Sequence, residues 1–300
     1  MIVVGVVAAL AAGASFAAGG VLQQQSAVEA PASDTLSVRL FGDVLRRPRW
    51  LIGVGLAVAA YGWQALALSA APLALVQPLI VSELLFAIPA SMWQRRLHLV
   101  ARDWAAIVAV AGGLGVALAA AAPRNGTGSS GPLGWVLALG CTVGVAAALT
   151  LSGRSRHGVG RAALFAAGAA VLFAAGSACL AQFVHELSTH GIVAGLTSWP
   201  PYALTGFSLL AFLLIQSAFQ AGPLAVVMPV SDVVEPLVAV LLGIAVLDEH
   251  IVATPGRLAL LAAATVVLLA GIVVLDRSPN VHAEQRLDGI AGRGERGRSG

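Results

Sequence analysis

The sequence contains no lysine, and charged residues of every kind are scarce. Asp, Glu, Lys and Arg make up 10% of the 300 residues, and all 17 basic residues are arginine. Without lysine the chain can neither form a Schiff base with a carbonyl group nor supply the lysine of a phosphate-binding P-loop. A net charge of +3 is also too small to indicate a nucleic-acid-binding protein.

The residues that build most enzyme sites are also sparse. Cys141 and Cys179 lie inside apolar runs, which is typical of packing residues and not of a disulfide or a metal site. His185 and His190 are five residues apart and miss the four-residue spacing of a zinc-binding helix, so we expect them, with Glu186, in a loop. We therefore expect no cofactor and no enzymatic activity.

Apolar residues, by contrast, dominate the chain. They make up 58% of it, and the mean hydropathy is +0.89, so the chain could not cover a water-facing surface. A membrane-spanning helix needs about 20 apolar residues. Nine runs meet this length, and they cover residues 2–22, 50–70, 72–93, 103–122, 133–151, 161–183, 202–220, 223–247 and 256–275. The sequence predicts an all-α integral membrane protein with nine transmembrane helices.

The arginines predict how these helices are oriented. With nine spans, 15 of the 17 arginines fall on one side of the membrane, and only Arg124 and Arg257 fall on the other. Arginine and lysine accumulate on the cytoplasmic side of membrane proteins. We therefore expect the N-terminus outside the cell and the C-terminus in the cytoplasm.

A repeated fragment divides the chain into two halves. Residues 72–79 (PLALVQPL) resemble residues 223–230 (PLAVVMPV), half a chain away. The two copies would cross the membrane in opposite directions, which is typical of an inverted structural repeat. The expected first repeat (1–122) holds four helices and a polar cytoplasmic segment (23–49), and the second (133–275) holds five. A connector (123–132) joins them, and a disordered cytoplasmic tail (276–300) follows.

Ionisable residues inside the spans mark the expected pathway. Glu83 and Glu235 lie near the middle of their runs, and Asp232 is one helical turn before Glu235. Charges at this depth are costly and usually face a solute or proton path. Gln77, Ser82 and Ser231 are candidates to line the same cavity, and Pro78 and Pro229 are expected to kink their helices. For Gln216 we favour interhelical hydrogen bonding. For Gln23, Gln24 and Gln25 we favour an interfacial position, and a gate is the alternative.

These stretches resemble the drug/metabolite transporter (EamA-like) superfamily. Residues 65–68 lead to Pro72 and Pro78, and residues 220–222 lead to Pro223 and Pro229, followed by Asp248 and Glu249. The start of the chain (13–22), residues 50–53 and residues 71–79 are most similar to its NIPA-type branch of magnesium transporters, in which the polar segment 23–49 would replace one helix. The resemblance implies paired inverted repeats, no catalysis and a transport function.

The expected function is thus alternating-access transport of a small solute through a midplane site, coupled to an ion. One alternative is a NIPA-like magnesium or divalent cation transporter, in which Glu83 and Glu235 would hold the metal. Another is a membrane scaffold without transport or a lipid-modifying enzyme, for which Asp248, Glu249 and His250 form a weak polar cluster. The expected partners are a small-molecule or cation substrate and the bilayer of the cell membrane. A second copy of the chain, in a homodimer, is a further candidate partner.

Overall fold

A computed structural model describes residues 2–29, 36, 38–70, 76, 79–94, 96–121, 130–247 and 254–278. Within these residues the chain is helical and contains no strand. The helices are α1 (Ile2–Val28), α2 (Val38–Leu45), α3 (Pro48–Ala70), α5 (Glu83–Gln94), α6 (Ala101–Ala121), α7 (Pro132–Arg154), α8 (Val159–Thr197), α9 (Pro200–Ala221), α10 (Leu224–Val246) and α11 (Pro255–Asp276). Most of the predicted connector and tail lies outside the described residues.

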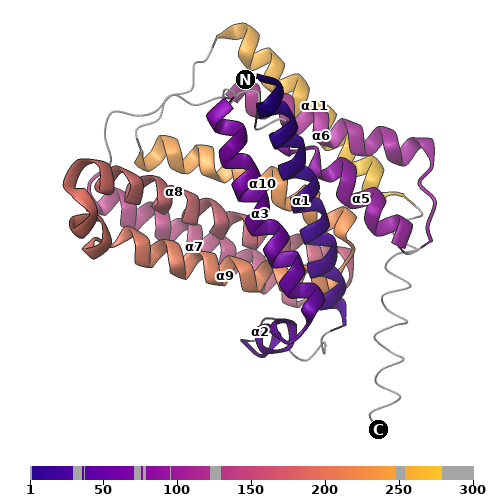
Figure 1. The fold of residues 1–300 in the computed structure, drawn as a ribbon, viewed down its shortest axis with the longest axis horizontal. Helices are drawn as coiled ribbons and strands as arrows, with labels where there is room; N and C mark the ends of the chain where they lie inside the picture. The colour runs from indigo at the N-terminus through magenta and orange to yellow at the C-terminus, as the bar shows by residue number, and fades with distance from the viewer. Residues whose placement is uncertain are drawn as a thin grey trace.

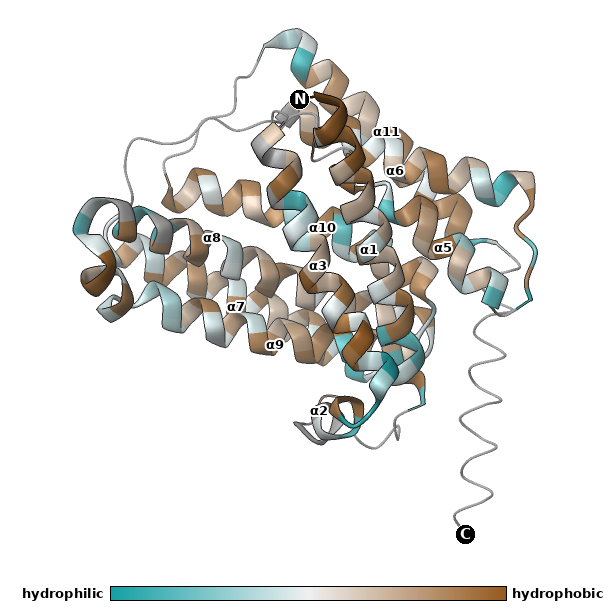
Figure 2. Ribbon diagram, in the orientation of Figure 1, coloured by the Kyte–Doolittle hydropathy of each residue, from teal (hydrophilic) through white to brown (hydrophobic). Residues whose placement is uncertain are grey.

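The helices carry an apolar surface that water would not tolerate. Seven of them in the described part are long and apolar enough to cross a bilayer, namely α1, α6, α7, α8, α9, α10 and α11. Large apolar side chains point outward along them, such as Leu133 on α7 and Val266 on α11, which are 71% and 66% exposed. Hydrophobic residues dominate the helices in Figure 2, and hydrophilic ones gather mostly at their ends. The chain is an all-α, polytopic membrane protein.

Three groups of packed helices organise the molecule. In the first half, α1 packs along α3 and against α5, and in the second half α8 packs along α9 and α10. Helices α6 and α11, one from each half, pack against each other, and α7 covers α8. In Figure 1, α7, α8 and α9 lie side by side, and α1 and α3 cross them steeply. The main hydrophobic core lies between the halves and includes Leu84, Phe165 and Leu224.

Close contacts show which helix ends meet. The end of α1 touches the start of α3 at Gly19 and Gly53, where an added Cβ on either glycine would come within 2.9 Å of the other's carbonyl oxygen. The end of α11 reaches the start of α6 in the same way, through Gly271 and Ala106. At the start of α7, the amide of Ser130 donates to the carbonyl of Val246 at the end of α10, over 2.9 Å. Neighbouring helices in these pairs therefore run antiparallel.

The structure corrects two predicted boundaries. Helix α1 continues to Val28, six residues past its predicted end, because Gln23 and Gln24 are buried against the second half instead of facing an interface. Helix α8 is also longer than predicted, and His185, Glu186 and His190 belong to it instead of a loop. It bends at Gly191, whose φ of 82° and ψ of 175° only glycine adopts readily, and then continues as helix to Thr197.

Replacing Gly53 by alanine is expected to destabilise the crossing of α1 and α3. The added Cβ would lie 2.9 Å from the carbonyl oxygen of Gly19 and 3.0 Å from Cγ of Gln23. Overpacking costs about 1–3 kcal/mol of unfolding free energy, more than the about 0.5–1 kcal/mol that alanine gains over glycine in a helix. Thermal unfolding in detergent measures the difference. Gly55→Ala, which has no atom within 4 Å of its Cβ, is the matched control, and an equal shift in both variants would contradict the packing argument.

Candidate functional site

The predicted helix over residues 72–93 is interrupted in the structure. Leu79 and Ile80 are helical, Val81 and Ser82 form a turn, and α5 begins at Glu83. The amides around the turn bond to carbonyls three residues back: Ser82 to Leu79 at 3.1 Å, and Leu84 to Val81 at 3.2 Å. This tighter pattern replaces the four-residue spacing of an α-helix. The expectation of one continuous helix over this span was therefore wrong.

Helix α1 supplies the space for this break. At Gly13 an added Cβ would lie 2.8 Å from Oγ of Ser82, 2.9 Å from the carbonyl oxygen of Ile80 and 3.2 Å from the amide nitrogen of Glu83. Only glycine lets the two backbones approach this closely. The contact places Glu83 in the first turn of α5, at the end of the helix where the macrodipole is positive.

Three carboxyl groups converge next to this break. Asp232 and Glu235 lie one turn apart on α10, and Glu83 comes to them from α5. The carboxyl groups of Glu83 and Asp232 are within hydrogen-bonding reach of each other, and Glu235 is near enough to interact electrostatically with both. All three side chains are partly buried. The structure thus brings together the three acidic residues singled out from the sequence.

The facing pair of carboxyl groups is chemically incomplete. Oδ2 of Asp232 is buried, and no hydrogen-bond donor reaches it. Two ionised carboxylates only accept hydrogen bonds and repel each other, so a proton or a cation between them would relieve the repulsion. In the described part of the chain, however, no three His, Cys, Asp or Glu side chains are arranged to hold a metal ion.

A tyrosine within electrostatic range of the carboxyl groups was not foreseen. Tyr61 on α3 lies close enough to Glu235 and Glu83 for its phenol to interact with their charges. Its ring meets that of Phe16 on α1 edge-to-face, with centroids 5.1 Å apart at 88°. One sequence feature could have pointed to Tyr61, because it lies within a predicted span and the whole chain holds only 2 tyrosines.

The remaining predicted site residues divide into three groups. Ser82 is 9% exposed and faces Gly13, and its hydroxyl has no hydrogen-bond partner. Ser231 is half-buried and precedes Asp232 in the chain. Pro229 lies inside α10 and is buried, and the kink expected there stays a prediction. Outside the described residues lie Gln77, Pro78, Asp248, Glu249 and His250.

A second proline within α10 was missed. Pro236 stands four residues after Asp232, and it has no N–H to donate to the carbonyl of that residue. This carbonyl therefore lacks the usual donor four residues further along the helix. A freed backbone carbonyl is tolerated in a membrane protein mainly where protein or a water-filled cavity satisfies it.

The polar side chains near the end of α8 form a separate, local group. Glu186 accepts a hydrogen bond from Nε2 of Gln182 at 3.0 Å and pairs with Nδ1 of His190 at 3.0 Å. All three residues lie on one helix and bond to neighbours one turn away. Only Oε1 of Gln182 is buried without a hydrogen-bond partner in this group.

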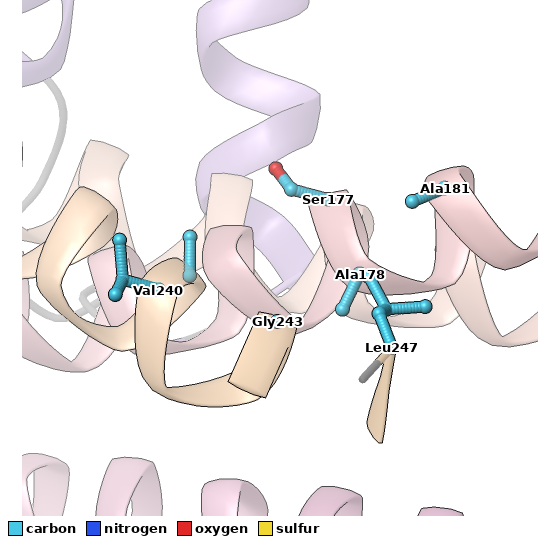
Figure 3. Close-up of a pocket in the computed structure, with 7 residues that line it drawn as sticks. Ser177, Ala178, Ala181, Val240, Gly243 and Leu247 are labelled. Atoms are coloured by element: carbon cyan, nitrogen blue, oxygen red, sulfur yellow. The ribbon is translucent and has the colours of Figure 1, made fainter. Parts of the chain in front are cut away.

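An apolar groove of about 180 Å³ lies between α8 and α10. Small side chains from both helices line it, and Figure 3 shows the hydroxyl of Ser177 at its edge. Its lining residues are Ser177, Ala178, Ala181, Ala239, Val240, Gly243 and Leu247. The groove contains no charged group and is therefore separate from the acidic site.

The fold and the site thus define a polytopic membrane protein with an acidic cluster between apolar helices. The chain is 28% identical over 282 residues to an uncharacterised protein of Corynebacterium glutamicum, and the match covers 92% of this chain and 95% of the relative. No protein-family model matches the chain, and no solved structure matches it. Both cysteines are free, as their positions in apolar runs predicted.

Proposed function

We propose that this protein is a transporter of the drug/metabolite type that moves a small solute across the cell membrane by alternating access. The observation that carries the proposal is the convergence of Glu83, Asp232 and Glu235 where a broken helix of one half meets a proline-containing helix of the other. Interrupted helices that meet between two repeats are the usual setting of a transporter's binding site. Intramembrane carboxyl groups are the usual carriers of coupling protons.

The packing of the helices supports a division into two related halves. Helix α1 packs on α3 and α5, and α8 packs on α9 and α10. In the two repeats, α1 would then correspond to α8, and α3 to α9. The broken segment before α5 would correspond to α10, and the repeated sequence fragment stands at the start of both. Helices α6 and α11 would close each half and meet at the seam. In this arrangement α7 is the extra helix of the second half.

The contacts between helix ends support the proposed alternation of the spans, in which successive helices cross the membrane in opposite directions. With the N-terminus outside, the ends of α1, α9 and α11 and the starts of α3, α6 and α8 would all be cytoplasmic. Contacts join these ends to one another: Gly19 meets Gly53, an added Cβ at Gly222 would touch Ala162, and Gly271 meets Ala106. The starts of α7 and α9, both assigned to the outside, meet through Trp135 and Trp199, whose ring centroids are 5.0 Å apart.

Proton coupling is the mechanism that we favour. One proton held between Glu83 and Asp232 would balance the pair, and an incoming cationic or polar solute would displace it. Magnesium transport is the second candidate, because magnesium usually keeps several waters and binds only one or two carboxylates directly. Three acidic residues without a metal-binding arrangement would still hold a hydrated ion, although less selectively.

Flux in proteoliposomes tests the proposal and separates the two mechanisms. The purified chain would be offered a panel of small organic solutes and divalent metals, with and without a protonophore. We expect uptake of at least one organic solute that disappears when the proton gradient collapses. Metal flux that survives this collapse would instead favour the divalent cation pathway. Folded, reconstituted protein that moves no member of the panel would favour a scaffold or a lipid-modifying enzyme.

Tyr61→Phe is expected to weaken solute binding while the fold is retained. The substitution keeps the ring and its edge-to-face contact with Phe16 but removes the hydroxyl near Glu235 and Glu83. Loss of one hydrogen bond to a solute would raise KM about tenfold at an unchanged maximal rate. Tyr202→Phe is the matched control, because the hydroxyl of Tyr202 bonds to the carbonyl of Leu196 at an exposed position. An equal effect of both substitutions would remove Tyr61 from the site.

A further inference from the structure

A buried chain of polar side chains joins the two halves at one end of the molecule. Nε2 of Gln216 donates to Oε1 of Gln23 at 2.8 Å, and Nε1 of Trp50 donates to Oε1 of Gln216 at 3.2 Å. Nearby, Nε2 of Gln24 donates to the carbonyl oxygen of Gly222 at 3.3 Å. The side chains are almost inaccessible: Gln216 is 0% exposed, Gln24 1%, Trp50 4% and Gln23 7%.

Each of these hydrogen bonds crosses between the halves. Gln23 and Gln24 belong to α1 and Trp50 to α3, whereas Gln216 and Gly222 belong to α9 and its end. The expected role of Gln216 in interhelical bonding is thereby confirmed, and Gln23 of α1, expected at an interface, is its partner. We propose that these five residues form a glutamine lock that closes the cytoplasmic end of the solute pathway. The inference rests on the proposed transport function and adds the conformational state of the protein.

The chemistry of the lock suits a contact that must open and close. Buried amides are costly unless they are hydrogen-bonded, so the closed state is stable only while the three bonds are intact. When the halves separate, water replaces each partner, and the amides remain satisfied. An apolar seam would instead expose hydrophobic surface to water on opening. A polar lock therefore holds the end shut at a small cost of reopening.

The position of the lock agrees with that of a gate. Gln23 lies ten residues after Gly13 on α1, and Gly13 faces the helix break. Ten helical residues rise about 15 Å, which is half the thickness of the hydrocarbon core. The neighbourhood of the lock is polar: Arg47 pairs with Glu29 and donates to its carbonyl oxygen at 2.9 Å. The amide of Leu36 donates to Oγ of Ser217 at 3.1 Å and ties the connecting segment to α9 at the same end.

A cysteine reporter between the lock and the acidic site tests the proposal. Gly20 lies one turn before the lock, and an added Cβ there would meet only the side chain of Met228, at 3.5 Å, which is an ordinary contact. Gly20→Cys would be introduced after Cys141 and Cys179 are replaced by serine. A membrane-impermeant methanethiosulfonate is then applied from the cytoplasmic side in inside-out vesicles, and the rate of labelling is measured without solute.

We expect slow labelling in the parent and about tenfold faster labelling when Gln216→Leu is added, because the bonds to Gln23 and Trp50 are lost. Trp50→Phe, which keeps the ring against Phe212 but removes the donor, should give a smaller increase. Gln182→Leu is the matched control: it is also buried, but its bond to Glu186 stays within α8, so labelling should not change. Elution as a single species verifies that each variant is folded.

Three results would overturn the lock. These are fast cytoplasmic labelling of the parent, unchanged labelling in both folded lock variants, and an equal increase in the Gln182 control. Labelling needs no solute flux, so the two proposals can fail separately. If the lock variants label faster while no solute is transported, the lock stands and the transport function falls. If transport is found and labelling is unchanged, the lock alone is wrong.

Discussion

Glu83→Gln is expected to reduce solute flux about 10- to 100-fold, the range that corresponds to loss of a hydrogen bond involving a charged group. The amide has nearly the same shape as the carboxyl group and can still donate to Asp232, so the fold should remain intact. It cannot bind or release a proton, and it cannot supply a negative charge to a cation. Initial rates in proteoliposomes, normalised to the amount of reconstituted protein, measure the effect.

The type of flux that is lost identifies what Glu83 does. If Glu83 carries only the coupling proton, the variant should still exchange solute down its gradient but no longer accumulate it. If Glu83 contacts the solute, exchange and accumulation should both fall. Glu186→Gln on α8 is the matched control, since that carboxyl group lies in a helix but pairs locally with Gln182 and His190. Full, gradient-dependent accumulation by the Glu83 variant would contradict the proposed site.

The same measurement on Asp232→Asn and on the double variant reveals whether the pair acts as one unit. Residues in direct contact give non-additive effects, whereas independent residues add. Because Glu83 and Asp232 face each other, the double variant should be little worse than the poorer single variant. Glu235, which interacts with the pair only at longer range, should combine with either variant more nearly additively.

Long apolar runs were predictable because their length and composition carry the information. The predicted spans at 103–122, 133–151, 202–220, 223–247 and 256–275 coincide closely with α6, α7, α9, α10 and α11. The extension of α1 through three glutamines was not predictable. Gln23 and Gln24 bond to α9 and the residue that follows it, almost 200 residues away, and hydropathy along the chain does not register such contacts.

The acidic part of the site was foreseeable for a related reason. A carboxylate inside an apolar run is costly and rare, so Glu83, Asp232 and Glu235 stand out in the sequence alone. Tyr61 and Phe16 do not, because aromatic residues in apolar helices usually pack against lipid or protein. Gly13 was indistinguishable from the other glycines among the 34 in the chain, since its importance lies in what faces it across the helix interface.

Gly13→Val should disable the site without removing any of its functional groups. Its first side-chain carbon alone would lie 2.8 Å from Oγ of Ser82 and 2.9 Å from the carbonyl oxygen of Ile80, and the two methyl groups of valine would add to the clash. The contacted atom of Ile80 is its backbone carbonyl oxygen, which directly precedes the tight turn. It therefore cannot move aside as the end of a flexible side chain would. Either α1 shifts away or the break at Val81 and Ser82 is remodelled, and both displace Glu83.

We expect this variant to lose most of its flux, about 100-fold, since a displacement of about 1 Å in a positioned site can cost that much. Stability should fall by only about 1–3 kcal/mol, as for other overpacked contacts, and thermal unfolding in detergent would measure this loss separately. Gly55→Val on α3 is the matched control, because an added Cβ there has no atom within 4 Å. Normal flux in a folded Gly13→Val protein would mean that the position of the broken helix does not control transport.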